Sequence, residues 1–484
     1  MVLARVLISP IGAGSYYKTL YKFDDGSEKV SSFIVEVLAE HIKAERVFLL
    51  GTSNSGWVQL YEHFTELTNE TLDIEYLKIL EQETKKEPYD IRLLDKVIKS
   101  IDTWLYKVNS SSKNNSKAIL LKYGIDNEEL MENFSEFMKI IDLLEDGDEI
   151  HIDITHAFRS IPVFMYLILE FIETLNYKKI KLCGMYYGMS EARTVFDKVD
   201  IIDYPVGENI RKLENERIIG DKPKNGKIPV GKIVNLKPIL DISKWIRSTH
   251  DFINYGNGYG ISTMIENDVN SNEITLTLGV KIKDISNLTN INFLVELRHE
   301  IKNMNSLLNT PDIDRGIIKY IKPILLDFTN RFSRLDTDSE FQLDLAKWYI
   351  ENKRYGHGYI CLVEAILTKT CELYGENVEN LNNRNLIKSA FFLTKKVKTS
   401  VDIKKYGDLF HETNSIRKKI AHASFISESS IDKIPYNRHI EKAQSYADDM
   451  EKLFNSPNIQ SMPNIITIEM IKRNYKPPNK NKRR

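Results

Sequence analysis

Cysteine is scarce in this chain. Its 484 residues include three cysteines, an odd number without paired spacing: Cys183, Cys361 and Cys371. The sequence therefore argues against a disulfide framework and against a thiolate zinc site. This composition suits a reducing compartment, so we expect a cytoplasmic protein.

Long apolar runs and an excess of charge are also missing. No stretch approaches the roughly 18 uninterrupted apolar residues of a membrane span, so no membrane contact is expected. The apolar run at 2–8 is cut by Arg5 and leads into a glycine turn, which favours a strand. Lys and Arg number 67 against 68 Asp and Glu, a net charge of −1. Any contact with nucleic acid must therefore come from local basic patches.

The length and the ordinary globular composition predict two domains. In residues 1–205 strands alternate with helices, which predicts an α/β doubly wound domain on a mainly parallel sheet. Strands are expected at 2–8, 46–50, 149–154 and 180–187, and helices at 31–44, 128–144 and 161–175.

A stretch rich in charge, Gly and Pro, residues 206–236, is expected to be a linker. Residues 237–464 have mostly helical periodicity and predict a mainly α domain. One exception is the alternation at 273–282, which predicts a small β insertion. Residues 465–484 are expected to form a basic tail. Helices are expected at 239–254, 293–308, 316–332, 341–352, 359–374, 384–396 and 407–421.

Three segments of the first domain follow strands, at the sheet edge where doubly wound folds bind ligands. The first contains Gly12, Gly14 and Ser15, and its glycines permit a backbone nest for a phosphate. Tyr17 stands where a dinucleotide fingerprint has its third glycine. A plain turn is the alternative.

The second segment contains Thr52, Ser53 and Asn54, whose side chains can donate to phosphate or ribose. An N-cap cluster is the alternative here.

The third segment runs from Asp153 to Arg159, between a buried strand and an amphipathic helix. Arg159 offers a planar fork for phosphate beside a helix N-terminus, while Thr155 and His156 supply neutral donors. The alternative makes Thr155 a cap and Arg159 a surface partner of Asp153.

The pattern Asp153-x-Thr155-His156-x-x-Arg159, with the glycine turn and the Gly51-Thr-Ser stretch, resembles the CRISPR-associated DxTHG-motif proteins that have a CARF sensor domain. Ala157 stands where that motif usually has glycine. The resemblance implies a Rossmann-like fold and a homodimer that binds a cyclic oligoadenylate across its two-fold axis, with the tetra-adenylate favoured. Tyr186 and Tyr187 are candidates to stack adenines, with core aromatics as the alternative.

In the second domain Arg417 is followed by His422, with Asn414 and Lys418 beside them, on a predicted helix. This resembles the R-x4-6-H signature of HEPN ribonucleases, which implies a composite RNA-cleaving site at the dimer interface. His is suited to acid–base chemistry near neutrality, and Arg to stabilising charge on a phosphorane, so no metal and no other cofactor is expected.

Two further carboxylates are candidate site residues. Glu364 lies alone on an apolar helix, and either orients Arg417 or pairs with a lysine. Glu300 with Lys302 resembles part of a metal-dependent DNase signature, but the segment predicts a helix where that fold has a strand.

The sequence thus predicts a cyclic-oligoadenylate-activated, metal-independent endoribonuclease of type III CRISPR antiviral defence that cuts single-stranded RNA. The alternative is a ligand-responsive nucleic-acid-binding regulator without nuclease activity. No compact helix-turn-helix is legible in 237–464, which favours the ribonuclease.

Overall fold

The protein is described by a computed structural model that covers residues 4–13, 16, 18–84, 86, 89–156, 161–175, 177–188, 201–203, 227–314, 316–422 and 435–475. The chain forms two compact units, Met1–Leu240 and Asp241–Arg484.

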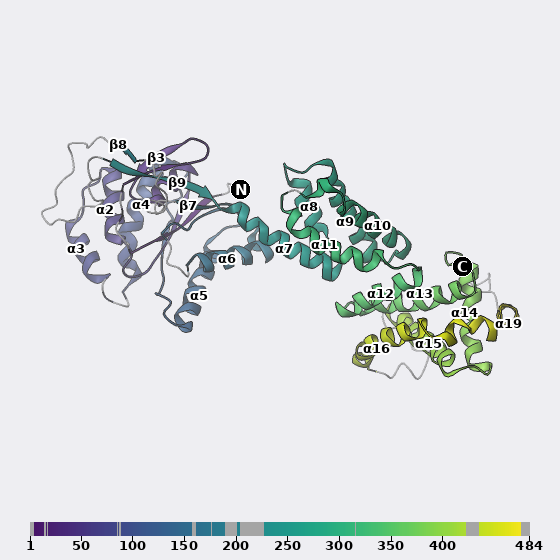
Figure 1. The fold of residues 1–484 in the computed structure, drawn as a ribbon. Coiled ribbons are helices and arrows are strands. Elements are labelled where there is room, and N and C mark those ends of the chain that lie inside the picture. Colours follow the sequence, from purple (N-terminus) through teal and green to yellow (C-terminus); the bar gives the residue numbers. More distant parts are fainter. Residues whose placement is uncertain are drawn as a thin grey trace, which may run out of the picture. The chain divides into compact units, whose positions relative to one another are not determined.

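The first unit is built on a nine-stranded sheet in the order β3-β2-β9-β7-β6-β1-β4-β5, with β8 paired to β9 (Figure 1). The neighbours from β7 to β5 are all parallel, which confirms the predicted α/β class. The strands are β1 (Arg5–Ile11), β2 (Thr19–Lys22), β3 (Glu28–Ser31), β4 (Arg46–Gly51), β5 (Lys117–Leu120), β6 (Glu149–Asp153), β7 (Lys181–Gly188), β8 (Ile201–Asp203) and β9 (Lys227–Asn235).

Helices cover both faces of this sheet. Successive side chains of a strand point to opposite faces, and in β1 the side chains on both faces include apolar residues that must be buried. Leu7 and Ile11 of β1 pack in one core with α1, α2 and α4, whereas Val6 and Ile8 pack in another with α5 and α6. The helices are α1 (Ile34–His41), α2 (Trp57–Thr68), α3 (Ile74–Glu83), α4 (Asp95–Val108), α5 (Asn127–Leu143) and α6 (Ile161–Leu175).

The connections reverse direction at β1. Among the parallel strands, β4 and β5 lie on one side of β1, whereas β6 and β7 lie on its other side. The β2–β3 hairpin, which comes between β1 and β4 in the chain, lies beyond β9 at the far edge. In doubly wound sheets the ligand crevice lies at such a switch point, beyond the carboxyl ends of the strands. The loops that follow β1, β4 and β6 therefore bound the expected site.

The stretch 206–236 is not only a linker. Residues 227–235 form β9, which pairs with β2, β7 and β8 and so belongs to the sheet of the first unit. Composition marked a break there because Gly and Pro are frequent, but the β-branched residues Ile228, Val230, Ile233 and Val234 favour a strand.

The described residues of the second unit are helical, and the helices predicted from periodicity are present. Their apolar faces form one core. Besides α7 (Lys237–Tyr255), which spans the unit boundary, these are α8 (Tyr259–Asn267), α9 (Glu273–Ile291), α10 (Leu294–Leu308), α11 (Ile318–Ser333), α12 (Asp338–Glu351), α13 (Tyr355–Leu373), α14 (Leu381–Lys396), α15 (Val401–Ala421), α16 (Tyr436–Phe454), α17 (Pro457–Gln460), α18 (Met462–Ile465) and α19 (Ile468–Asn474).

The predicted β insertion at 273–282 is wrong, since these residues begin α9. Asn272 caps the helix through a capping box with Thr275. Leu278 and Ile282, one helical turn apart, are fully buried. Ile274, one turn before Leu278, packs half-buried against the same core, whereas Leu276 and Val280 are exposed at 42% and 51%. Every second apolar residue of the alternation therefore falls on one face of the helix. Packing of this face against the core stabilises the helix over a strand.

The basic tail predicted at 465–484 also begins too early. Thr467 caps α19 by accepting a hydrogen bond from the backbone N–H of Met470, and Ile471 is buried in the core. Residues 476–484 lie outside the described residues.

Candidate functional site

The loops after β1, β4 and β6 meet at the switch point. A Cβ built on Gly12 would lie 3.1 Å from the carbonyl oxygen of His156, a tighter contact than most Cβ atoms make, so glycine suits this close approach. The Gly12 carbonyl accepts hydrogen bonds from the Gly56 N–H at 3.0 Å and from the Tyr16 hydroxyl at 2.9 Å. The structure thus brings Gly12 and His156 together, as expected, and their role in ligand binding stays a prediction.

Asp153 organises this corner from inside. Its side chain is fully buried and accepts hydrogen bonds from the Ser9 hydroxyl at 2.7 Å and from the Thr155 N–H at 2.8 Å. Burial raises the pKa of this carboxyl, while the hydrogen bonds from Thr155 and Ser9 oppose the shift. The Thr155 hydroxyl in turn accepts the Gly188 N–H at 2.9 Å. Both side chains therefore shape the turn, and the carboxylate of Asp153 is out of reach of a surface partner.

Tyr16 is a site residue that sequence reasoning missed. Its ring stacks on Phe33 at 4.3 Å and meets the ring of His156 edge-on at 5.3 Å. A Cβ on Gly56 would lie 2.6 Å from the Tyr16 ring. Tyr16 therefore contacts all three loops. The sequence feature that could have indicated it is the pair of tyrosines directly after the glycine turn.

The turn after β4 uses most of its polar side chains internally. The Ser55 hydroxyl donates to the Ile11 carbonyl at 2.6 Å and accepts from the Thr52 N–H at 2.9 Å. Thr52 and Ser53 are buried, at 1% and 5% exposure, whereas Asn54 is exposed. Of the three predicted donors, Asn54 is the side chain that this structure presents to solvent.

Three predicted ligand residues cannot be placed. Gly14, Ser15 and Arg159 lie outside the described residues, as do Tyr17 and Ala157.

Tyr186 is not an exposed stacking platform. Its ring lies back over Gly184, near parallel to the ring of His151 at 5.9 Å, with its hydroxyl 3.1 Å from His151 Nδ1. It therefore points toward the amino end of β6 and away from the ligand edge, which favours the core-aromatic alternative. Tyr187 is half-buried opposite Val234 of β9, and its role stays a prediction.

The buried side chain of His151 should make the first unit less stable in acid. Burial lowers its pKa from 6.5 to about 4, so the unfolded chain binds its proton first as the pH falls. The contribution of neutral His151 to the free energy of unfolding is therefore fully present above pH 6.5 and is lost as the pH drops toward 4. Between pH 7 and pH 5 we expect His151 to contribute a loss of about 2 kcal/mol.

A His151→Gln variant isolates this effect because Gln does not titrate. Urea unfolding at both pH values should show a smaller acid loss in the variant than in the wild type. Equal losses would contradict the assignment.

In the second unit Arg417 and His422 lie at the end of α15. Arg417 is half-buried and donates to Asn414 Oδ1 at 2.8 Å; its Nε is enclosed without an acceptor among the described residues. His422 follows the last helical turn with an exposed side chain, while its backbone N–H donates to the Lys418 carbonyl at 3.0 Å. Lys418 is also exposed. The pair thus presents one anchored cation and one accessible imidazole.

Glu364 has a different partner from either one expected. Its carboxylate forms an ion pair with Arg384 of α14, whose guanidinium also donates to Thr368 Oγ1 at 3.1 Å. Neither Arg417 nor a lysine is that partner. Arg384 suits this position better than a lysine would, because its planar guanidinium can donate to the carboxylate and to the hydroxyl at once.

Lys388, one turn further along α14, shares this surrounding. Burial lowers its pKa, and the charges of Arg384 and Arg417 lower it further against the opposing effect of Glu364. Here the basic side chains of Arg384, Lys388 and Arg417 outnumber the single carboxylate of Glu364. This excess of positive charge favours anions. Sequence reasoning missed Arg384 and Lys388, although their i, i+4 spacing on a predicted helix was legible.

The nuclease-like Glu300 lies on α10 and pairs with Lys281 at 2.7 Å. The helix confirms that this segment lacks the strand that a metal-dependent DNase requires.

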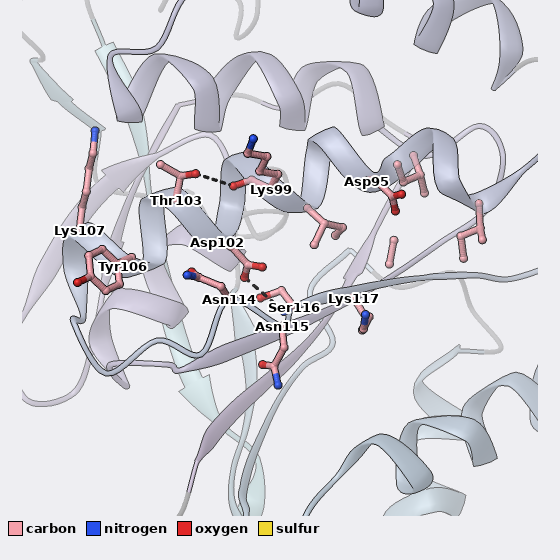
Figure 2. Close-up of a pocket in the computed structure, with 14 residues that line it drawn as sticks. Asp95, Lys99, Asp102, Thr103, Tyr106, Lys107, Asn114, Asn115, Ser116 and Lys117 are labelled. Atoms are coloured by element: carbon pink, nitrogen blue, oxygen red, sulfur yellow. Dashed lines mark hydrogen bonds between the residues drawn. The ribbon is translucent and has the colours of Figure 1, made fainter.

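A groove of about 830 Å³ lies elsewhere, between α4 and the start of β5 (Figure 2). Asp102 in its wall accepts the Ser116 N–H at 3.3 Å, and burial raises the pKa of this carboxyl. None of the predicted site residues lines it. Size alone therefore does not make this groove the candidate ligand site, which we place at the strand ends.

Within the part of the chain that the structure describes, no helix combines the length and apolarity needed to cross a membrane.

Comparison with known proteins defines the class of the first unit. Residues 6–191 match the family model of the CRISPR system endoribonuclease Csx1, CARF domain. Residues 241–340 match the model of the CRISPR-associated protein MJ1674, second domain. The first unit is therefore a CARF domain on a Rossmann-like sheet.

The whole chain has a relative as well. It is 36% identical over 455 residues to the CRISPR-associated protein MJ1674 of Methanocaldococcus jannaschii, covering 90% of this chain and 64% of that protein. The chain thus spans slightly less than two thirds of that relative. Over that length it is similar to a CRISPR-associated protein, and its first unit matches a CARF domain.

Among solved structures, Csm6 of Enterococcus italicus bound to cyclic hexa-2'-fluoro-hexa-dAMP matches 97% of this chain and 99% of that chain. The TM-score is 0.35 and the sequence identity 11%, a likeness that supports no inference about this chain.

Proposed function

We propose that this protein is an ancillary effector of type III CRISPR defence, in which a cyclic oligoadenylate bound to the CARF domain activates cleavage of single-stranded RNA by the helical unit. The observation that carries the ligand proposal is the meeting of Gly12 and His156 at the switch point of a CARF domain. Backbone donors and neutral side chains suit the phosphates of such a ring. The proposed assembly is a homodimer, with the tetra-adenylate favoured.

Cleavage is proposed to need no metal. His422 removes the proton from a ribose 2′-hydroxyl, whose oxygen attacks the adjacent phosphorus as the bond to the 5′-oxygen breaks, and the departing 5′-oxygen takes a proton from water. Arg417 stabilises the charge that develops on the phosphorane, and Asn414 keeps its guanidinium in place. The excess of cations formed by Arg384, Lys388 and Arg417 supports attraction of the RNA backbone. The products carry a 2′,3′-cyclic phosphate or 3′-phosphate and a 5′-hydroxyl.

The test incubates the protein with labelled single-stranded RNA in excess chelator, without ligand and with cyclic tetra- or hexa-adenylate. We expect cleavage in the presence of one ring, with cyclic-phosphate ends. Cleavage only after a divalent metal is restored would overturn the metal-free mechanism. Ligand binding without cleavage under any condition would favour the ligand-responsive binding regulator.

A further inference from the structure

Tyr123 lies at the same sheet edge as the candidate ligand site, in the loop that follows β5. Its hydroxyl accepts a hydrogen bond from Asn54 Nδ2 at 2.5 Å and lies 3.2 Å from Ser53 Oγ. The residue is 37% exposed. An aromatic side chain is thereby tied to the one predicted β4 donor that faces solvent.

The loop around Tyr123 is held from both sides by α5. Asn133 accepts from the Lys122 N–H at 2.7 Å and donates to the Lys122 carbonyl at 2.9 Å. Glu129 accepts from the Gly124 N–H at 2.8 Å, where a φ of +74° suits glycine. The ring is therefore fixed before any ligand arrives, which reduces the entropy that binding must overcome.

The position of Tyr123 matches an extended ligand. The strands β6, β1, β4 and β5 are consecutive in the sheet, so the loops after β6 and β5 are separated by three strand spacings, about 14 Å. A single nucleotide at the switch point covers only part of that distance, whereas a ring of several nucleotides spans it.

We propose that Tyr123 stacks on an adenine of the bound ring and forms the outer end of a ligand surface that begins at Gly12 and His156. This inference rests on the proposed function, because the ligand is the same cyclic oligoadenylate. Each base has a π-face, and an exposed aromatic ring binds it without reading its sequence. Tyr123 takes the role that Tyr186, turned toward His151, does not fill.

The test measures the Kd of cyclic tetra- and hexa-adenylate by calorimetry for the wild type, Tyr123→Ala and Tyr123→Phe. Loss of the ring should weaken binding about tenfold, whereas Phe, which keeps the ring, should stay within about twofold of the wild type. Tyr106→Ala is the matched control, since Tyr106 is 56% exposed on α4 and lines the groove of Figure 2. Its affinity should not change.

Two results would overturn the stacking role. Tyr123→Ala could bind as tightly as the wild type, or Tyr123→Phe could lose as much affinity as Tyr123→Ala, which would assign the effect to the hydroxyl and the Ser53–Asn54 turn. Failure of the wild type to bind either ring would instead reject the proposed function, and the stacking role with it.

Discussion

Replacing His422 by Ala should lower ligand-stimulated RNA cleavage by roughly 10²- to 10⁴-fold, the range expected when a general acid or base is removed. The imidazole is exposed at the end of α15, so its loss leaves no cavity in the core. Binding of the cyclic oligoadenylate by the CARF domain should remain unchanged. The measurement is the initial rate of cleavage of labelled RNA at saturating ligand.

His299→Ala is the control for this experiment. Its side chain is 73% exposed on α10, so the substitution removes an accessible imidazole from the same unit. Cleavage by this variant should match the wild type. Undiminished cleavage by His422→Ala would remove His422 from the catalytic site.

Replacing Asp153 by Ala should disable activation through the CARF domain. The buried Ser9 hydroxyl and Thr155 N–H would both lose their acceptor, which should cost about 2 to 4 kcal/mol of unfolding free energy. The turn that carries His156 would lose its anchor. We expect at least a roughly 100-fold increase in the ligand concentration for half-maximal RNA cleavage, the equivalent of about 3 kcal/mol.

Asp153→Asn separates charge from shape. The amide oxygen can accept from Thr155 while the amide nitrogen donates to Ser9. Because burial raises the pKa of Asp153, the charged carboxylate is less favourable in the folded state than in the unfolded chain, and the wild type loses stability as the pH rises above 3.8. At pH 7 the Asn variant should therefore be at least as stable as the wild type and retain activation. An Asn variant as impaired as the Ala variant would show that the corner needs the negative charge.

Much of the fold could be predicted because periodicity reports burial directly. The helix at 161–175 has the predicted bounds, and β4 differs from the prediction by one residue. Strand pairing is a different matter. The place of β9 between β2 and β7 depends on contacts between residues far apart in the chain, which no local pattern contains.

The candidate ligand site shows the same division. That Gly12 and His156 meet followed from the rule that strand ends converge at a switch point. The burial of Thr52 and the direction of the Tyr186 ring depend on side-chain packing, so sequence left both open. Tyr123 lies in a stretch without periodicity, and its significance depends on its contacts with Ser53 and Asn54.

The strand β9 also decides how the CARF domain can be studied in isolation. An expression fragment that stops at residue 205, the boundary that composition indicates, lacks the strand between β2 and β7. Both strands would then present bare backbone donors and acceptors, a template for aggregation. A stand-alone fragment of the CARF domain should therefore extend beyond Asn235, so that it contains every strand of the sheet.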